Sequence, residues 1–438
     1  MVSSTIPPTI ERTAGLTSGL ELPASPRTIA DLKLDPGFLH GLVLKNLYLS
    51  GHSTADDIAE RMALPLGPTL EILDALRHER LTEILGSDSQ SLGGYRYSLT
   101  NSGLERAAAT LEQNGYAGPT PVTLHEYVDM VRRQSVRELH ITRDAIESSL
   151  SPLVLTQETL DLIGQAITSE RAVLLYGESG NGKTTASECL RQALEGHILI
   201  PHAVEVARQA IQLFDPASHE VVPEPSADNK AVRPDVDRRW VRIRRPVVTA
   251  AGELAANHLE LIRDEISKTY EAPIQMKANG GLLVIDDFGR QRLDAAYLLN
   301  RWIVPLEKGL DTLSLSNGAR FEVPFDVIPL FLSNKNPVEL ADEAFLRRIR
   351  YKIEIPGPTR DLFEAILRQE CERNSVAYDE AAINHLVEEY FIKPNREMRG
   401  CHPRDLVEAI ADAANYRGTE RVLTPETIAN AAASYFID

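Results

Sequence analysis

The sequence predicts an α/β fold, in which a parallel sheet flanked by helices is followed by an all-helical unit and preceded by a smaller mixed unit. Between residues 151 and 355, apolar stretches typical of buried strands alternate with helical stretches, and this alternation favours a parallel sheet. From 356 to 438, four amphipathic helices are expected without a strand between them. The length of 438 residues fits about three units of ~150 residues each.

Composition and charge narrow the class of protein. The chain is 43% hydrophobic and 25% charged, which is ordinary for a globular protein. Its 46 basic and 63 acidic residues give a net charge of −17, so bulk charge disfavours binding to nucleic acid or anionic membranes. Three widely separated cysteines indicate a reducing compartment. There is no signal-peptide pattern and no apolar run of ~20 residues, so we expect a cytoplasmic protein without membrane insertion.

The first 150 residues divide into three segments. Residues 1–30 are rich in Ser, Thr, Pro and Gly and are expected to be a disordered leader. Residues 31–113 should form a compact unit with helices at 38–49, up to 62, 65–80 and from 102, and an edge strand at 95–99. Residues 114–150 are expected to be a linker, marked by GYAGPTP at 115–121, and a helical stretch.

The first motif of chemical interest in the central unit, residues 151–355, is a phosphate loop. An apolar strand at 172–176 is followed by GESGNGKT and a helical stretch, the context that makes the motif specific. Glycines let backbone N–H groups surround phosphates at a helix N-terminus. Lys183 would reach the β- and γ-phosphates, and Thr184 would coordinate Mg²⁺. The candidate phosphate-binding residues are Gly177, Glu178, Ser179, Gly180, Asn181, Gly182, Lys183, Thr184 and Thr185.

A second motif ends another predicted strand. The stretch at 280–285 (GGLLVI) is apolar throughout and runs into Asp286 and Asp287. Ligands of open α/β sheets bind where strands end, so Asp286 is expected to hold Mg²⁺ and Asp287 to polarise the attacking water. Two further strands of the same sheet are expected at 198–206 and 327–333.

With these two motifs the region from 151 to 438 resembles the AAA+ ATPases, in which a nucleotide domain is followed by a helical lid, here 356–438. The resemblance implies ATP and Mg²⁺ as cofactors. It places Asn334 at the sensor-one position and makes Arg348 the arginine finger, with Arg347 as the alternative. In the lid, Arg404 takes the sensor-two position. The family usually has Asp-Glu where this chain has Asp286-Asp287, so slow hydrolysis or switch-like behaviour is an alternative.

Two features resemble one branch of that family. Residues 278–281 (ANGG) before the second motif resemble members with a helix-two insertion, including the MoxR-like ATPases and enhancer-binding activators. Alternating segments at 312–316 and 319–323 flank Asn317-Gly318, which is a strong hairpin signal. The resemblance makes this a pore-facing pre-sensor-one hairpin; an ordinary surface hairpin is the other interpretation. Residues 334–337 (NKNP) lack the Asp of a GTPase base-reading motif, which favours ATP.

The arginine finger implies an assembly. Such an arginine acts on the γ-phosphate of the neighbouring subunit, so a homo-oligomer is expected, as a hexameric ring or a helical assembly. Surface pairing of Arg348 with Asp342 or Glu343 is the plainer interpretation.

Residues 31–113 resemble a winged helix-turn-helix of the MarR-like kind, most clearly over 97–106 (YSLTNSGLER). The resemblance suggests DNA binding through residues 65–80. However, residues 36–110 carry six basic and nine acidic residues, and a helical wheel places Glu71 and Asp74 outward opposite a stripe of Leu66, Leu70, Leu73 and Leu76. Docking of a protein is therefore favoured over DNA. An arginine cluster at 238–245 is more simply a solvated face than a nucleic-acid site.

The sequence thus predicts an AAA+ ATPase that hydrolyses ATP with Mg²⁺ at subunit interfaces and remodels or regulates a protein client, in a chaperone-like way. Two alternatives stay open. One is a DNA-handling ATPase, such as an initiator, helicase loader or transcription activator, and the other is a nucleotide-gated scaffold with little hydrolysis. The identity of the client and the size of the oligomer are not encoded in any motif.

Overall fold

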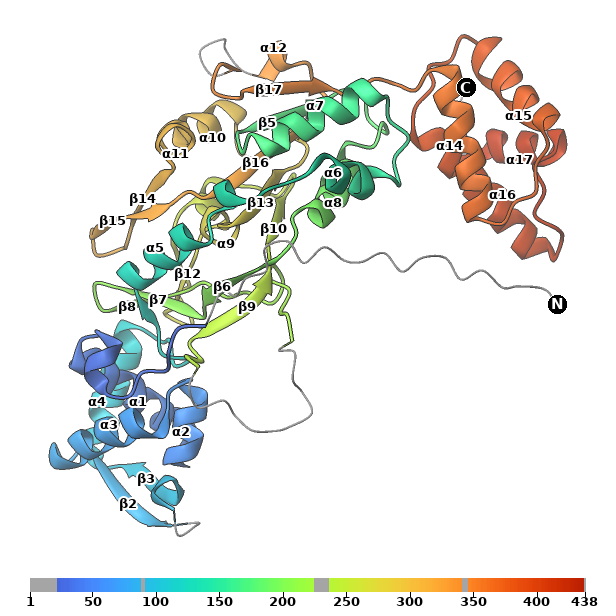
Figure 1. Ribbon diagram of the computed structural model, residues 1–438. Helices are drawn as coiled ribbons and strands as arrows, with labels where there is room; N and C mark the ends of the chain where they lie inside the picture. Colours follow the sequence, from blue (N-terminus) through green and yellow to red (C-terminus); the bar gives the residue numbers. More distant parts are fainter. Residues whose placement is uncertain (1–21, 88–90, 224–235, 341–345, 437–438) are drawn as a thin grey trace, which may run out of the picture.

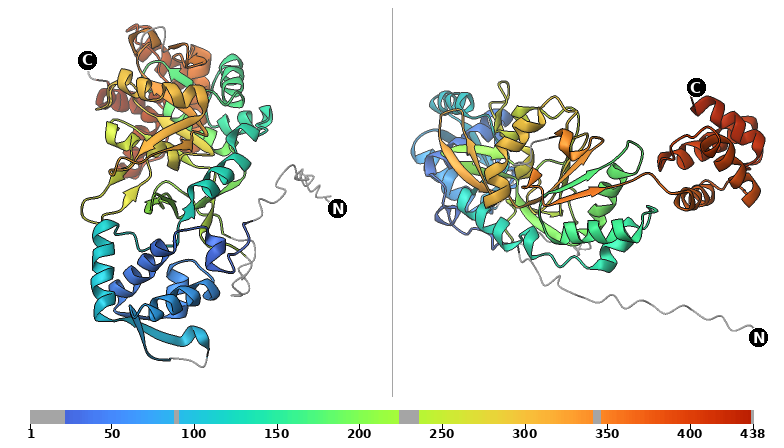
Figure 2. Two further views of the ribbon diagram at one scale, coloured as in Figure 1. Left: turned by 90° about the vertical axis from the view of Figure 1, so that its left-hand side faces the viewer. Right: turned by 90° about the horizontal axis from the view of Figure 1, so that it is seen from above.

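The computed structural model describes residues 22–87, 91–223, 236–340 and 346–436. The chain is arranged as an elongated molecule with three parts (Figure 1). An N-terminal unit of helices and strands lies at one end, a helical lid at the other, and the α/β body between them. Figure 2, seen from above, shows the lid beyond one end of the body, which it joins through an extended segment. None of the described helices is both long and apolar enough to cross a membrane.

The N-terminal unit packs four helices around a small antiparallel sheet of order β1-β3-β2. Local capping fixes its helices. Asp35 accepts from the Phe38 amide at 3.0 Å to begin α1, and Thr100 accepts from the Gly103 amide at 3.1 Å to begin α4. Its elements are α1 (Pro36–Ser50), β1 (His52–Thr54), α2 (Ala55–Arg61), α3 (Leu66–His78), β2 (Thr82–Ser87), β3 (Tyr95–Leu99) and α4 (Asn101–Gln113).

Three expectations for this part of the chain were wrong: the edge strand at 95–99, the leader up to residue 30 and the linker at 115–121. The strand at 95–99 is the centre of its sheet, because β1 and β2, too short or too polar to show a strand pattern, pair with it on both sides. Residues 22–30 of the expected leader are ordered: the Pro23 carbonyl accepts from the Asp237 amide, and a short 3₁₀ turn runs Ile29–Leu32. Residues 1–21 lie outside the described part.

The expected linker at 115–121 is packed against the body. The Gly115 amide donates to the Lys268 carbonyl at 3.2 Å, and a side chain at Gly115 would meet the Ser267 carbonyl oxygen at 1.8 Å. Tyr116 is 6% exposed. Beyond it, β4 (Val122–Thr123) pairs with a strand of the body, and α5 (Leu124–Arg133), a turn at Val136–Glu138 and α6 (Arg143–Leu150) lead into α7 (Gln157–Thr168).

The body contains the predicted parallel sheet, in the order β10-β13-β16-β5-β17. All four pairings are parallel, and the strands are β5 (Val173–Tyr176), β10 (Val247–Ala250), β13 (Gly281–Ile285), β16 (Val327–Ser333) and β17 (Tyr351–Glu354). Strands β13 and β16 are buried at every residue, as expected where helices cover both faces. The covering helices include α7 and α8 (Lys183–Ala193) on one side and α10 (Ala295–Arg301) and α11 (Ile303–Lys308) on the other (Figure 1).

One predicted strand of this sheet does not belong to it. Residues 198–206 are divided at His202 between β6 (His197–Pro201), which pairs with β9 (Trp240–Arg244), and β7 (Ala203–Val206). Strand β7 joins a second sheet of order β11-β12-β8-β7-β4, whose other strands are β8 (Gln209–Gln212), β11 (Ile262–Arg263) and β12 (Tyr270–Glu271). The place in the parallel sheet is taken by β10, which follows directly on the arginine cluster.

Of the remaining segments, the hairpin and the lid agree with the sequence prediction, whereas two short helices of the body were not predicted. Strands β14 (Leu310–Ser314) and β15 (Arg320–Pro324) form the hairpin around Asn317-Gly318. A turn of helix, α12 (Pro337–Leu340), follows β16, and a four-residue α9 (Ile274–Lys277) precedes β13. The lid consists of α14 (Arg360–Arg373), α15 (Glu380–Val387) with a π-helical extension to Ile392, α16 (Cys401–Arg417) and α17 (Pro425–Tyr435).

Candidate nucleotide-binding site

The phosphate loop connects β5 to α8, and its backbone requires glycine. Gly177, Gly180 and Gly182 have φ of 140°, 89° and 86°, a region that residues with a side chain rarely adopt. Space is restricted as well, because a Cβ at Gly177 would lie 2.3 Å from the Ile355 carbonyl oxygen. The loop therefore wraps closely around the N-terminus of α8, where backbone N–H groups point outward and favour an anion.

Lys183 is folded back onto this loop. Its Nζ donates to the Gly177 and Glu178 carbonyls at 2.8 and 2.9 Å, and the residue is 7% exposed. Burial lowers the pKa of Lys183, an effect opposed by the nearby Asp286 carboxylate. The ammonium group is thus held at the loop by neutral carbonyls, which a phosphate oxygen would replace as a stronger, charged partner.

Two carboxylates and an amide meet the loop at the ends of adjacent strands. Thr184 Oγ1 donates to Asp286 Oδ2 at 2.9 Å, so the two expected Mg²⁺ ligands are already in contact. Asp286 follows β13, and Asn334 follows the neighbouring strand β16. The Asn334 amide donates to Asp287 Oδ1 at 3.3 Å. Asp287 itself has φ of 51°, an unfavourable conformation for a non-glycine residue that is typical of functional sites.

These residues line a cleft of about 420 Å³ between the body and the lid. Its apolar wall comes from the segment at 152–155, and its lid wall from α14, where Ile366, Gln369, Glu370 and Arg373 face it, and from the start of α16. The lining includes most of the predicted site residues: Ser179, Gly180, Asn181, Gly182, Lys183, Thr184, Thr185, Asp286, Asp287, Asn334 and Arg404. Sequence reasoning missed the α14 residues, because their spacing of three and four residues is that of any amphipathic helix.

The loop also touches the lid directly. Asn181 Oδ1 accepts from the Gly400 amide at 3.2 Å, and Asn181 Nδ2 donates to the Ile355 carbonyl at 3.4 Å. One loop side chain therefore bridges the lid and the end of β17. Arg404 is half exposed, and its guanidinium donates to the carboxylate of its neighbour Asp405 at 2.9 and 3.1 Å.

The two finger candidates lie outside the cleft of their own chain. Arg348 Nε donates to Glu307 Oε1 of α11 at 2.9 Å, and Arg347 is exposed. Asp342 and Glu343, the other partners considered for Arg348, fall in the segment 341–345 outside the described residues.

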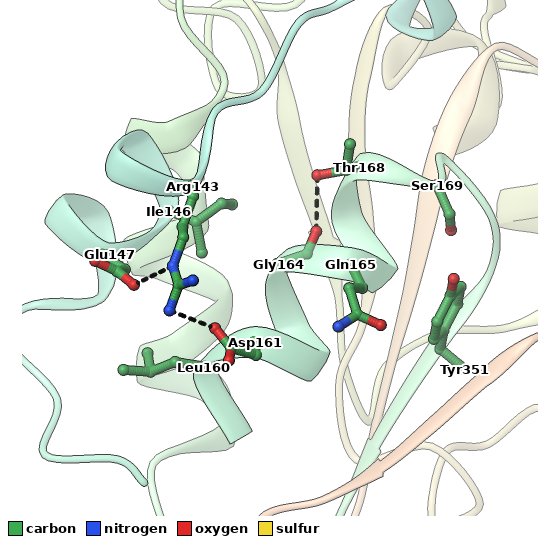
Figure 3. Close-up of a pocket in the computed structure, with 10 residues that line it drawn as sticks. All are labelled: Arg143, Ile146, Glu147, Leu160, Asp161, Gly164, Gln165, Thr168, Ser169 and Tyr351. Atoms are coloured by element: carbon green, nitrogen blue, oxygen red, sulfur yellow. Dashed lines mark hydrogen bonds and ion pairs between the residues drawn. The ribbon is translucent and has the colours of Figure 1, made fainter. Parts of the chain in front are cut away.

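A second cavity, of about 550 Å³, lies away from these groups between α6, α7 and β17 (Figure 3). Arg143 crosses its mouth and is neutralised by Glu147 at 2.7 Å and Asp161 at 3.0 Å. Gln165 and Thr168 of α7, with Ser169 directly after it, supply only neutral polar groups. Arg143 is the single basic residue of the described lining and is paired with two carboxylates, so this cavity is poorly suited to a phosphate.

The arginine cluster at 238–245 is largely structural. Arg239 is 3% exposed and pairs with Asp237 at 2.7 Å, while Arg245 is buried and donates to the Gln134 and Gly280 carbonyls. Arg244 pairs with Glu220 at 2.8 Å. Burial lowers the pKa of Arg245 to about 10. The cluster therefore joins the insertion to the body and does not present a continuous basic surface.

The strand order and phosphate loop described above give residues 157–355 a phosphate-loop α/β fold. A family model described as a domain of unknown function (DUF8689) matches residues 359–434, the helical lid. No curated protein matches the sequence.

Solved structures similar to the chain have low identity. NtrX from Brucella abortus is 13% identical over 64% of this chain, with a TM-score of 0.39, and the match spans 56% of the NtrX chain. Two mutant forms of RuvB from Thermotoga maritima are 14% and 12% identical over 70% and 68% of this chain and 74% and 71% of theirs, each with a TM-score of 0.37.

Proposed function

We propose that this chain is an ATPase of the AAA+ kind, which binds ATP with Mg²⁺ in the cleft between the body and the lid. The observation that carries the proposal is the convergence of Lys183, Thr184, Asp286 and Asn334, drawn from three places in the sequence, on one cleft. An acidic pair at the end of one strand and an amide at the end of its neighbour form the arrangement expected for phosphoryl chemistry.

The residues present fit the proposed cofactors. The glycine backbone and the N-terminus of α8 offer N–H groups, and the Lys183 ammonium offers positive charge to a triphosphate. Among the described residues no group of three or more His, Cys, Asp or Glu forms a metal site. Thr184 and Asp286 would supply two oxygen ligands. Proteins commonly bind Mg²⁺ through one or two such ligands, and the phosphates of the substrate complete its coordination. Bound Mg²⁺ would neutralise charge on the phosphates.

Asp287 is the proposed residue that orients and polarises the attacking water, and Asn334 fixes the direction of its carboxylate. The side chain of Asp287 is one methylene shorter than the Glu that is usual at this position. Its carboxylate would therefore lie farther from the attacking water, which supports slow hydrolysis of ATP. A nucleotide-gated scaffold with little hydrolysis is the second candidate on this ground. Arg404, once released from Asp405, is proposed to contact phosphate from the lid side, which its place in the lining of the cleft supports.

Arg348 is proposed to act on a neighbouring subunit, with Arg347 as the alternative. Its position outside its own cleft supports action in trans within a homo-oligomer, a ring or a helical assembly. The Arg348–Glu307 pair is partly exposed, with side chains 28% and 52% accessible, and surface ion pairs contribute only ~0.2–1 kcal/mol. The β14–β15 hairpin is the proposed pore-facing element.

The N-terminal unit is proposed as a winged-helix module that recruits a protein client. Glu71 and Asp74 are exposed on α3, the helix that would enter a DNA groove, and Asp74 neutralises Arg77 at 2.7 Å. Phosphate contacts dominate DNA affinity, so this face supports protein docking over duplex binding. The helical wheel of residues 65–80 predicted the buried stripe of this helix wrongly in one detail. Ile72 and Thr69 are buried in the core, whereas Leu66 and Leu70 are only partly buried.

The test is ATP turnover and particle size, measured with and without nucleotide. We expect turnover that depends on Mg²⁺, a nucleotide-dependent increase in particle size, and loss of both with Lys183→Ala. Exposed Lys308, changed to Met, is the matched control and should behave as wild type. The proposal is refuted if the protein stays monomeric and neither binds nor hydrolyses ATP at millimolar concentration. Stimulation by duplex DNA and not by protein would favour the DNA-handling alternative.

A further inference from the structure

A cavity of about 270 Å³ lies between the N-terminal unit and the body, far from the nucleotide cleft. Its walls come from α1, from α4 and from the β7–β8 turn at 207–208, which lie together at the junction seen in Figure 1. The volume is near the lower limit for ligand sites and equals roughly nine waters at ~30 Å³ each. It therefore suits a small molecule.

Lys45 is the unusual residue of this cavity. It is 2% exposed, and its Nζ donates to the Asn114 carbonyl at 3.0 Å. Within the described part of the chain, no carboxylate forms an ion pair with it. Burial alone lowers the pKa of Lys45, to about 8, so it is still mostly charged at neutral pH. A buried ammonium group without a counter-charge is costly, and the protein retains one that lines an open cavity.

The other charged groups around the cavity are mostly occupied with one another. His40 Nδ1 of α1 lies 3.4 Å from Glu79 Oε1, which is an ion pair only when the imidazole is protonated, and Arg208 of the β7–β8 turn pairs with Asp35 at 3.0 Å. Arg106 of α4 also lines the cavity, and its side chain is exposed. With His40 neutral, the described lining carries three cations, Lys45, Arg106 and Arg208, against the two carboxylates of Asp35 and Glu79, so its net charge is positive. Within the described residues, neither Lys45 nor Arg106 forms an ion pair with these carboxylates.

The turn that carries Arg208 is held in an unfavourable conformation. Ala207 and Arg208 have φ of 50° and 62°, in a two-residue hairpin between Val206 and Gln209. Such turns are normally Asn-Gly, and a non-glycine residue in this region costs on the order of 1 kcal/mol or more. The conformation closes the cavity with Arg208 at its mouth and Gln209 bonded to Asn114, the residue whose carbonyl holds Lys45.

We propose that this cavity is an effector site for a small organic anion, bearing a carboxylate or a phosphate group, with Lys45 as its buried counter-charge and Arg106 as its second contact. The bound anion would satisfy the ammonium group and connect α1 and α4 of the N-terminal unit to the β7–β8 turn of the body. This site is independent of the proposed ATP site, so it can regulate how the N-terminal unit is held without touching the nucleotide.

The test uses the full chain with saturating ADP and Mg²⁺, so that the nucleotide cleft is occupied. Inorganic phosphate and succinate are titrated by calorimetry, with sodium chloride at matched ionic strength as the reference. We expect saturable binding of at least one probe, and the tighter of the two identifies the group recognised. Lys45→Met should weaken binding at least tenfold and Arg106→Gln at least threefold. Lys308→Met should leave it unchanged.

Lys183→Ala separates the two sites, because it disables the nucleotide cleft and should leave the anion response intact. Binding at pH 8.5 should also take up protons from the buffer, since an anion beside Lys45 favours its charged form. The proposal is overturned if neither probe binds more than chloride, or if Lys45→Met and Arg106→Gln both bind as the wild type does. Loss of the response in Lys183→Ala alone would assign the anion to the phosphate loop and overturn it too.

Discussion

Replacing Lys45 with Met tests the energetic cost of the buried ammonium group. The pKa of Lys45 falls from 10.5 to about 8 on folding because of burial. Each tenfold change in proton binding is worth ~1.4 kcal/mol, so the charged lysine lowers the free energy of unfolding by about 3 kcal/mol at pH 7. Methionine fills a similar volume without charge, so the variant avoids this penalty. The lost hydrogen bond to the Asn114 carbonyl cancels ~1 kcal/mol of that gain in the free energy of unfolding. We therefore expect a net gain of about 2 kcal/mol.

The sign of the pH dependence follows from the same pKa. Between pH 8 and 10.5 the unfolded chain binds more protons than the folded chain, so the lysine penalty shrinks as pH rises. At pH 9.5 the penalty is only ~1.5 kcal/mol, and the advantage of Lys45→Met should narrow accordingly. Urea unfolding followed by circular dichroism at pH 7 and 9.5, without added phosphate or carboxylate, measures both values.

Lys308→Met is the control, because Lys308 is exposed and the change should stay within ~0.5 kcal/mol at both pH values. The reasoning is refuted if Lys45→Met is less stable than the wild type at pH 7, or if the difference between the two proteins is the same at both pH values.

Three further predictions concern the nucleotide cleft. Asp287→Asn should reduce ATP turnover by at least a hundredfold while binding stays within threefold, and equal losses of both would argue against a role in activating water. Arg348→Ala should abolish the turnover of the assembled oligomer, and mixing it with subunits that carry Asp287→Asn, which still bind ATP and keep Arg348, should partly restore activity; no restoration would contradict action in trans. Glu370 is 7% exposed, and its Oε2 has no hydrogen-bond partner among the described residues, while Oε1 accepts from Arg373 at 2.9 Å. A single available acceptor suits the amino group of adenine, which ITP lacks. Glu370→Gln should therefore bring the dissociation constants of ATP and ITP closer together. If the ratio of these two constants is the same as in the wild type, the contact is excluded.

The phosphate-loop geometry could be predicted from the sequence because its signals are local. Three glycines precede Lys183, and each adopts a φ that only glycine takes easily. Strands β13 and β16 were equally clear, since burial on both faces produces continuous apolar runs.

The insertion could not be predicted in the same way. Its strands are short and pair with distant segments, as when Val122 of β4 lies opposite Val204 of β7. Strand β10 was hidden because a run of arginines precedes it. The bond between Asn181 and Gly400 joins residues 219 apart in sequence, and no local pattern marks such a contact. Long-range pairing is decided by how the whole chain packs, which single-sequence patterns do not encode.

The pairing of β4 with β7 has a mechanical consequence. The only covalent path from the N-terminal unit to the rest of the described chain runs through residues that are themselves a strand of the body's second sheet. A partner bound to the N-terminal unit would therefore be held directly against the body, without a flexible linker between them. Any rotation of the body would then change the orientation of that partner as well as its position.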